Sequence, residues 1–324
     1  MNNFKFWLVA IVVVGVLNGW MVRWVSANGL PESGMALFPA GEFLMGSDEG
    51  VGRPDERPRH KVYLDAFYLD RFEATGKDFE EYLAANPKQH PTITGWWGRE
   101  VRPDMKNRPV FGLTWKRCKN YCEWRGKRLA TEAEWERAAT GLEGREFPWG
   151  NTQPDSERAN FNKCCFVMKG LSTDEVGSHP SGASPEGVHD LSGNIAEWVY
   201  DWYDKKYYQH SEYKNPKGPD KGVNHTIRGG AWNSLDGYLR SSARFGYDEA
   251  KDFYGIGCRC AMSVEKNNYC KRLNGVSAFM KDLNSQIDSM FREKIYHVLG
   301  ENASRIQKLN IRHTKSNKKY SPEH

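Results

Sequence analysis

Two closely spaced pairs of cysteines constrain the fold of this 324-residue chain more than any other sequence feature. Cys118 and Cys122 stand four residues apart in a segment with helical periodicity, so they are expected to share one helix face. Cys258 and Cys260 stand two residues apart in a strand-like segment and also share a face. Two parallel helix-to-strand disulfides are geometrically possible, and a four-cysteine zinc site would use the same thiolates. A disulfide that closes about 138 residues is worth about 4 to 5 kcal/mol in the chain-entropy model.

Residues 1–27 have the order of a secretory signal. Lys5 precedes seventeen uncharged residues, which are followed by Arg23 and small residues up to Ala27. Cleavage after Ala27 and retention as an N-terminal anchor in the inner membrane both stay open. Both place the rest of the chain outside the cytoplasm, in the periplasm or secreted, where disulfides are the default. The odd total of seven cysteines leaves open the pairing of Cys164, Cys165 and Cys270.

The charge distribution argues against a nucleic-acid partner. The chain carries 46 basic and 41 acidic side chains, a net charge of +5. Residues 305–324 contain six of the basic side chains and one acidic side chain, so the rest of the chain balances at 40 against 40. A nucleic-acid-binding face would need its positive excess within a folded domain. The sequence also contains no G-x-S-x-G elbow, no phosphate-binding loop and no dinucleotide fingerprint.

The pattern of apolar residues and turn signals predicts an α+β domain with little regular secondary structure. Helices are expected at 77–85 after Thr75, at 114–125, and from a capping box at 131–134 to Gly141. Residues 35–47 read as a hairpin, and residues 60–74 alternate as one half-buried strand. The stretches 142–190 and 205–225 have no periodicity.

After Ser263 the composition changes. An amphipathic helix is expected within 264–300, because apolar residues recur at helical spacing, at Val276, Met280, Leu283, Ile287 and Met290. This helix either folds back on its own domain or docks an envelope protein or peptide partner. Residues 301–324 form a basic polar tail.

Seven segments give the chain a specific resemblance to the formylglycine-generating enzyme (sulfatase-modifying factor) family. They are FPAGEFLMGS at 38–47, DERPRHKVYLDAFYLDRFEAT at 55–75, WKRCKNYCEWRGKRLATEAEWERAA at 115–139, FPWGN at 147–151, DLSGNIAEWVYDWY at 190–203, IRGGAWNS at 227–234 and GIGCRCAMS at 255–263. The resemblance covers residues 33–263 and implies one domain with a C-type-lectin-like core. It also implies a disulfide between Cys122 and Cys260, whereas a bridge between Cys118 and Cys258 is a geometric inference of our own.

The reaction that the resemblance implies oxidises a substrate cysteine to formylglycine at a copper ion held by two thiolates. Monovalent copper is soft and needs sulfur ligands. The two family cysteines fall on Ser234 and Leu239, and the family's active-site serine falls on Ala231. Copper and formylglycine generation are therefore not expected. A different chemistry would use a pocket near Trp232, Asn233, Ser234 and Arg240.

Calcium is the cofactor that the resemblance still favours. Asp190 and Glu197 supply carboxylate oxygens, and the carbonyls of Gly193 and Ile195 can complete a shell of hard oxygen donors. A second family site is matched only at Asn160 and Phe161, because no aspartate occurs in residues 162–172.

Three functions are compatible with these observations. The first is a calcium-stabilised binding or assembly module of the cell envelope, which presents the loops around 88–108, 161–175 and 231–253 to a protein, peptide or glycan. The second is an oxidative enzyme of the same superfamily that acts on a peptide or small molecule without copper-thiolate chemistry. The third is an accessory protein for the maturation of a redox enzyme. Loss of the copper thiolates and the added C-terminal helix favour the first.

Overall fold

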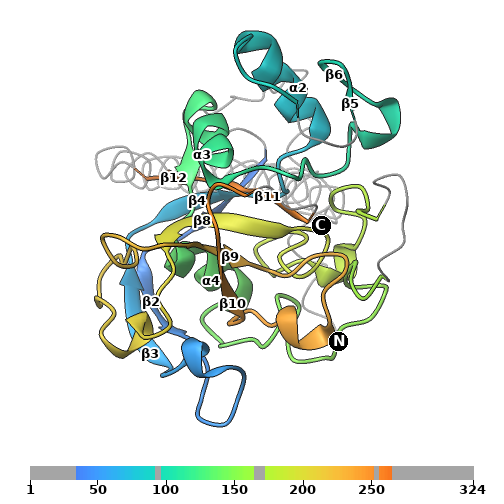
Figure 1. Cartoon of the computed structure of the whole chain (residues 1–324). Coiled ribbons are helices and arrows are strands. Elements are labelled where there is room, and N and C mark those ends of the chain that lie inside the picture. Colours follow the sequence, from blue (N-terminus) through green and yellow to red (C-terminus); the bar gives the residue numbers. More distant parts are fainter. Residues whose placement is uncertain (1–33, 92–95, 164–171, 252–254, 265–324) are drawn as a thin grey trace, which may run out of the picture. The chain divides into compact units, whose positions relative to one another are not determined.

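The computed structural model describes residues 34–91, 96–163, 172–251 and 255–264 (Figure 1). The chain divides into two units, residues 1–263 and 264–324, and nearly all described residues belong to the first. The expected signal or anchor, the C-terminal helix beyond residue 264, the basic tail, Cys164, Cys165 and Cys270 lie outside the described residues. Within the described ranges no helix is long and apolar enough to span a membrane.

The first sheet joins strands from the beginning, middle and end of the domain. Its order is β1-β4-β12-β7, and each neighbouring pair is antiparallel. The strands are β1 (Met35–Phe38), β4 (Phe67–Asp70), β12 (Cys260–Ser263) and β7 (Arg128–Leu129). Because β12 lies between β4 and β7, residues near position 260 complete a sheet that begins more than 200 residues earlier in the chain.

The second sheet carries the segments with the chemically informative motifs. Its order is β10-β9-β8-β11, with β11 parallel to β8 and the other pairs antiparallel. The strands are β10 (Arg244–Tyr247), β9 (His225–Arg228), β8 (Ala196–Trp202) and β11 (Ile256–Cys258). Two small antiparallel pairs complete the described strands: β2 (Gly41–Met45) with β3 (His60–Leu64), and β5 (Trp96–Trp97) with β6 (Glu100–Val101).

The three predicted helices are confirmed, each with the expected threonine cap. They are α2 (Gly76–Ala85) after Thr75, α3 (Trp115–Trp124) after Thr114 and α4 (Glu132–Thr140) after Thr131. In α4, the Thr131 hydroxyl accepts from the Glu134 backbone and the Glu134 carboxylate accepts from the Thr131 backbone, so two unpaired donors are satisfied. In the described parts of the unpatterned stretches 142–190 and 205–225, the helical segments are the short 3₁₀ turns η3 (Pro180–Gly182) and η4 (Tyr207–Gln209). Three further 3₁₀ turns lie elsewhere: η1 (Pro54–Glu56), η2 (Pro103–Met105) and η5 (Asp236–Tyr238).

Two strand predictions were wrong. Residues 35–47 do not form a hairpin, because β1 pairs with β4 and β2 pairs with β3. Residues 60–74 do not form one strand, because the chain leaves the β2–β3 pair at Asp65 and enters the first sheet at Phe67. Between β3 and β4, the backbone N–H of Asp65 donates to the Asn215 side chain over 2.8 Å. This hydrogen bond takes the place of one to a neighbouring strand. Burial alternates along β3 but not along β4, where Phe67, Tyr68 and Leu69 are all buried. The C-type-lectin-like core remains a prediction.

Helix α4 lies at the centre of the core, in contact with β2, β3, β8 and β9 (Figure 1). All nine of its residues are buried, including Glu132 and Glu136. Arg244 donates twice to Glu132 over 2.7 Å, and Arg228 pairs with Glu136. Both arginines come from the second sheet, so the helix is held to that sheet by ion pairs as well as by apolar contacts.

The disulfide between Cys122 and Cys260 is present and joins α3 to β12. The second expected bridge is absent from the structure, where Cys118 and Cys258 are buried thiols. Burial, followed by the interaction with Cys258, raises the pKa of the Cys118 thiol well above its usual value. Cys258 and Cys260 were expected on one strand, but they end β11 and begin β12, which belong to different sheets. The buried side chain of Arg259 occupies the break between them.

We predict that Cys122→Ser and Cys260→Ser each destabilise the domain by a similar amount, and that the double variant costs little more than either single one. Each change removes the same covalent constraint on the unfolded chain, worth about 4 to 5 kcal/mol. Denaturant unfolding of the three variants measures this. Additive losses would show that the two cysteines act independently.

A pH-dependent stability is expected from Asp201 of β8. Its buried carboxylate accepts from the Glu132 backbone N–H over 2.8 Å, and burial, followed by the charge of Glu132, raises its pKa well above the usual value. A group whose pKa is higher in the folded than in the unfolded state contributes stability below the unfolded pKa and loses it as the pH rises through the folded pKa.

We therefore predict that Asp201→Asn, which keeps an acceptor for the Glu132 N–H, gains stability relative to the unaltered protein as the pH rises from about 4 to about 8. The difference in free energy of unfolding, measured at several pH values, tests this. A difference that does not change with pH would contradict a raised pKa at Asp201.

Candidate functional site

The turn that follows β9 positions the segment where the sequence places the lost copper site. Gly229 and Gly230 have φ angles of +90° and +71°, a region that favours glycine. A Cβ atom on Gly229 would lie 3.1 Å from the Leu191 carbonyl oxygen and 3.2 Å from the Trp135 ring. The two glycines therefore allow the chain to turn tightly against α4 and the 190–197 segment, which then lies beside residues 231–240.

Ser234 and Leu239 both lie next to Gly230. A Cβ atom on Gly230 would be 3.3 Å from the Cβ of Ser234 and 3.1 Å from a methyl group of Leu239. The Ser234 hydroxyl accepts from the backbone N–H of Ala231 over 2.9 Å. Leu239 is fully buried and packs in the cluster with Phe147. The two positions thus offer one hydrogen-bonded hydroxyl and one hydrocarbon, a pair that cannot bind soft copper.

The remaining residues of the predicted pocket do not converge on one open site. Arg240 donates to both carboxylate oxygens of buried Glu56 over 2.6 and 2.8 Å. Burial acts to raise the pKa of Glu56, but the hydrogen bond and charge of Arg240 outweigh burial and lower it. Trp232 packs against the core, and Asn233 is exposed. The guanidinium of Arg240 therefore forms a structural ion pair with Glu56.

The 190–197 segment has the backbone of a binding loop. Asp190, Gly193 and Asn194 all have positive φ angles, between +57° and +87°. The Asp190 carboxylate accepts from the Gly177 N–H over 2.7 Å, and burial raises its pKa. Glu197, in contrast, is bound by Arg259 at 2.8 to 3.1 Å and by the Trp135 indole N–H at 2.7 Å. Its negative charge is already compensated.

Glu73 is a buried acid beside this loop that the sequence analysis missed. Its carboxylate accepts from the Asn194 side chain over 2.7 Å and from the Ile195 N–H over 3.2 Å. Burial, followed by the charges of Asp190 and Glu197, raises its pKa well above the usual value. No local motif marks Glu73, because it approaches the loop from the chain that follows β4.

The second expected calcium position contains an unsatisfied hydrogen-bond acceptor. Asn160 is buried, and its amide nitrogen donates to the Ser172 carbonyl and to the Asn194 side chain. Its side-chain oxygen has no hydrogen-bond partner among the described residues. The N–H of Asp174 also donates to the Asn194 side chain, which places an aspartate in this region just beyond the 162–172 segment.

These residues fit calcium in part. A buried amide oxygen without a partner is the kind of hard ligand that calcium accepts, and Asp190 offers a buried carboxylate in the 190–197 segment. Glu197 fits less well, because Arg259 would repel a cation placed on it. The Asp174 carboxylate is bound by His179 and Lys163 at 3.1 Å. In the part of the chain that the structure describes, no three His, Cys, Asp or Glu side chains form a metal-binding group.

Comparison with known proteins relates these features to one family. The model of the sulfatase-modifying factor enzyme 1-like domain matches residues 24–264. The serine/threonine-protein kinase pkn1 of Chlamydia pneumoniae is 37% identical over 246 residues, which cover 71% of this chain but only 38% of that kinase. The chain therefore matches less than half of that protein's length.

Other relatives include catalytic and inactive proteins. The formylglycine-generating enzyme of Mus musculus is 31% identical over 277 residues, covering 70% of this chain and 74% of the enzyme. The inactive C-alpha-formylglycine-generating enzyme 2 of the same organism is 32% identical, covering 71% and 86%. The solved structure of PvdO from Pseudomonas aeruginosa matches with a TM-score of 0.60 and 26% identity, over 71% of this chain and 94% of that one.

The family match covers most of the chain, and the sequence relatives and the solved structure agree with the motifs and the fold. The chain therefore belongs to the formylglycine-generating enzyme (sulfatase-modifying factor) family.

Proposed function

We propose that this protein is a binding or assembly module of the cell envelope and does not generate formylglycine. The observation that carries the proposal is the pair Ser234 and Leu239, which both lie next to Gly230 and occupy the positions where the resemblance places two thiolates. Leu239 is fully buried in an apolar cluster. A small rearrangement would therefore not bring a copper-coordinating side chain from another residue to this position. A relative of similar identity whose name marks it as inactive gives the proposal a precedent.

The expected export of the chain supports an envelope location, and the helix expected within 264–300 would dock a protein or peptide partner. An oxidative enzyme with other chemistry is less well supported. In the pocket expected for such an enzyme, Arg240 is neutralised by Glu56 and the Ser234 hydroxyl already accepts from the Ala231 N–H.

We predict that the unaltered protein neither binds copper(I) at this segment nor converts a peptide cysteine to an aldehyde. The double variant Ser234→Cys/Leu239→Cys should bind one additional copper(I) ion, because it restores two adjacent sulfur ligands. Competition with a chromophoric copper(I) chelator measures binding, and mass spectrometry of a cysteine-containing peptide measures oxidation. The Leu239→Cys change should cost about 1 to 3 kcal/mol of stability through lost packing.

The two single variants are matched controls, because each adds one thiol to the cysteines already present. Neither should gain the tight copper site. Aldehyde formation by the unaltered protein with copper and oxygen would overturn the proposal, and an equal gain of copper by the single variants would show that the two positions do not act as a pair.

We propose further that calcium stabilises the region between Asn160 and Glu197. Support comes from the unpaired buried oxygen of Asn160 and from the Asp190 carboxylate in its left-handed loop. The carbonyls of Gly193 and Ile195 would supply further oxygen donors. The cation would offset the repulsion among Glu73, Asp190 and Glu197, which are close enough to raise the pKa of Glu73.

Asp190→Asn tests this proposal, because asparagine can still accept from the Gly177 N–H but carries no charge. In excess calcium the variant should melt at a clearly lower temperature than the unaltered protein, whereas in a chelator the two should melt at similar temperatures. Asp220→Asn, in an exposed loop, is the control and should be neutral in both conditions. Equal destabilisation of Asp190→Asn with and without calcium would count against ligation.

A further inference from the structure

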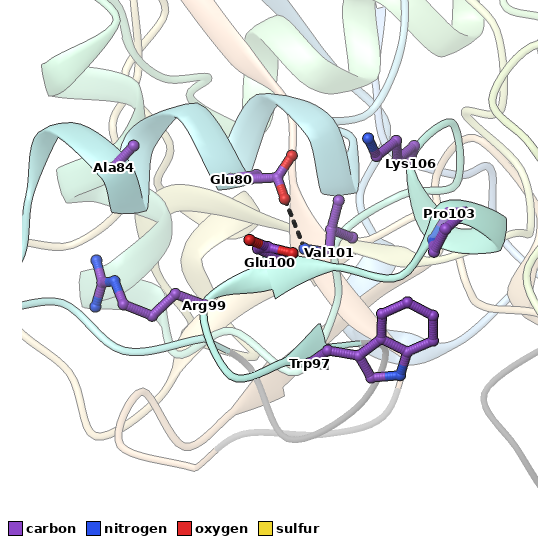
Figure 2. Close-up of a pocket in the computed structure, with 8 residues that line it drawn as sticks. All are labelled: Glu80, Ala84, Trp97, Arg99, Glu100, Val101, Pro103 and Lys106. Atoms are coloured by element: carbon purple, nitrogen blue, oxygen red, sulfur yellow. Dashed lines mark hydrogen bonds between the residues drawn. The ribbon is translucent and has the colours of Figure 1, made fainter.

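A cavity of about 480 Å³ opens away from the segments discussed above, between α2, the β5–β6 hairpin and the turn η2. Figure 2 shows its lining, which combines one aromatic ring with charged side chains: Glu80, Ala84, Trp97, Arg99, Glu100, Val101, Pro103 and Lys106. Its volume lies within the usual range for small-molecule sites. It belongs to the 88–108 region that the sequence analysis expected to present to a ligand.

The hairpin forces a tryptophan to face solvent at this cavity. Successive residues of a strand point to opposite sides, so Trp96 and Trp97 point in opposite directions. Trp96 packs edge-on against Phe79 at 6.2 Å and anchors the hairpin to the core. The hairpin reverses through Gly98, at φ +64°, and Arg99. Trp97 is consequently 65% exposed, an unusual position for so large an apolar ring.

Two of the charged groups in the cavity are held in place by the backbone. Glu80 accepts from the Val101 N–H over 2.8 Å, which fixes its carboxylate beside the hairpin. The Arg99 guanidinium donates to the Gln89 carbonyl over 2.6 Å and to the Leu83 carbonyl, where it caps the C-terminal end of α2. These groups need little reordering when a ligand binds, which favours affinity.

The charges around the cavity balance. Glu80 and Glu100 are opposed by Arg99 and Lys106, and Figure 2 shows the two carboxylates near the middle of the cavity with Arg99 and Lys106 toward opposite ends. An anion would meet the two carboxylates, and a cation would meet the two basic groups. A purely apolar ligand would leave the charged groups without water or partners, at a cost. Balanced charges around one aromatic face favour a neutral ligand rich in hydroxyl groups.

We propose that this cavity binds a neutral saccharide unit, with one face of the sugar ring stacked on Trp97 and its hydroxyls bonded to the charged rim. The C–H groups on one face of a pyranose carry partial positive charge, and the face of an indole ring is negative. Each hydroxyl can both donate and accept, so it can donate to Glu80 or Glu100 and accept from Lys106. The inference rests on the proposed binding function and names the class of ligand.

The test is a titration of the full chain with free hexoses, N-acetylhexosamines and their disaccharides, followed by ligand-observed NMR. At least one should bind, and Trp97→Ala should weaken its Kd by about tenfold or more, because the stacked ring is lost. Trp97→Phe keeps a ring and should lose less. Tyr200→Ala removes a 44% exposed ring of β8, outside the cavity, and should leave the Kd unchanged.

Two further measurements separate sugar binding from charge recognition. Binding of a neutral ligand should be nearly independent of salt concentration. Glu100→Gln keeps a hydrogen-bond acceptor and removes the charge, so for a neutral ligand it should weaken the Kd less than Trp97→Ala does. Steep salt dependence with a large loss in Glu100→Gln would show recognition of a cation and overturn the proposal. Failure of the whole neutral panel to bind, or binding unaffected by Trp97→Ala, would also overturn it.

This experiment is independent of the test for thiol oxidation. Aldehyde formation together with Trp97-dependent sugar binding would overturn the proposed function and leave the saccharide site standing. No aldehyde and no sugar binding would leave the binding module standing and remove the saccharide as its ligand.

Discussion

Buried arginine–glutamate pairs are the interaction on which the rest of the domain depends. Arg228 and Arg244 from the second sheet pair with Glu136 and Glu132 of α4, and all four side chains are buried. A buried pair of this kind is weak evidence of net stabilisation, but removal of one partner leaves an uncompensated charge and typically costs about 3 to 5 kcal/mol. The pairs therefore specify the position of α4 against the sheet more than they add stability. The turn after β9 and the 190–197 loop are placed by that packing.

The same use of charge limits the chemistry of the motifs shared with the family. Glu197 compensates Arg259, and Glu56 compensates Arg240, so neither ion pair has a charge free for catalysis. Ser234 and Leu239, both next to Gly230, present a hydroxyl and a buried hydrocarbon. The chain thus has the family's fold but no sulfur at the two positions where the resemblance places the thiolates. This combination supports the proposed binding role.

The cavity beside Trp97 and the 160–197 region are separate elements with different physical bases. The cavity depends on strand alternation, which packs Trp96 against the core and exposes Trp97, and on backbone contacts that hold Glu80 and Arg99. The 160–197 region contains left-handed backbone positions and a buried amide oxygen without a partner among the described residues. The proposed binding at the cavity and the proposed stabilisation by a cation should therefore be separable by mutation.

The three helices, the tight turn at Gly229 and Gly230, and the absence of thiols at positions 234 and 239 follow from the sequence alone. Each of these depends on the residue types at a few neighbouring positions: the helix caps, the glycines of the turn and the side chains that could bind a metal. The family resemblance also supplied the Cys122–Cys260 disulfide. Only the tertiary structure decided which strands pair, that Cys258 and Cys260 belong to different sheets, and that Glu73 lies near Asp190. These outcomes depend on contacts between residues far apart in the chain, and side-chain alternation alone does not say which sheet a strand joins.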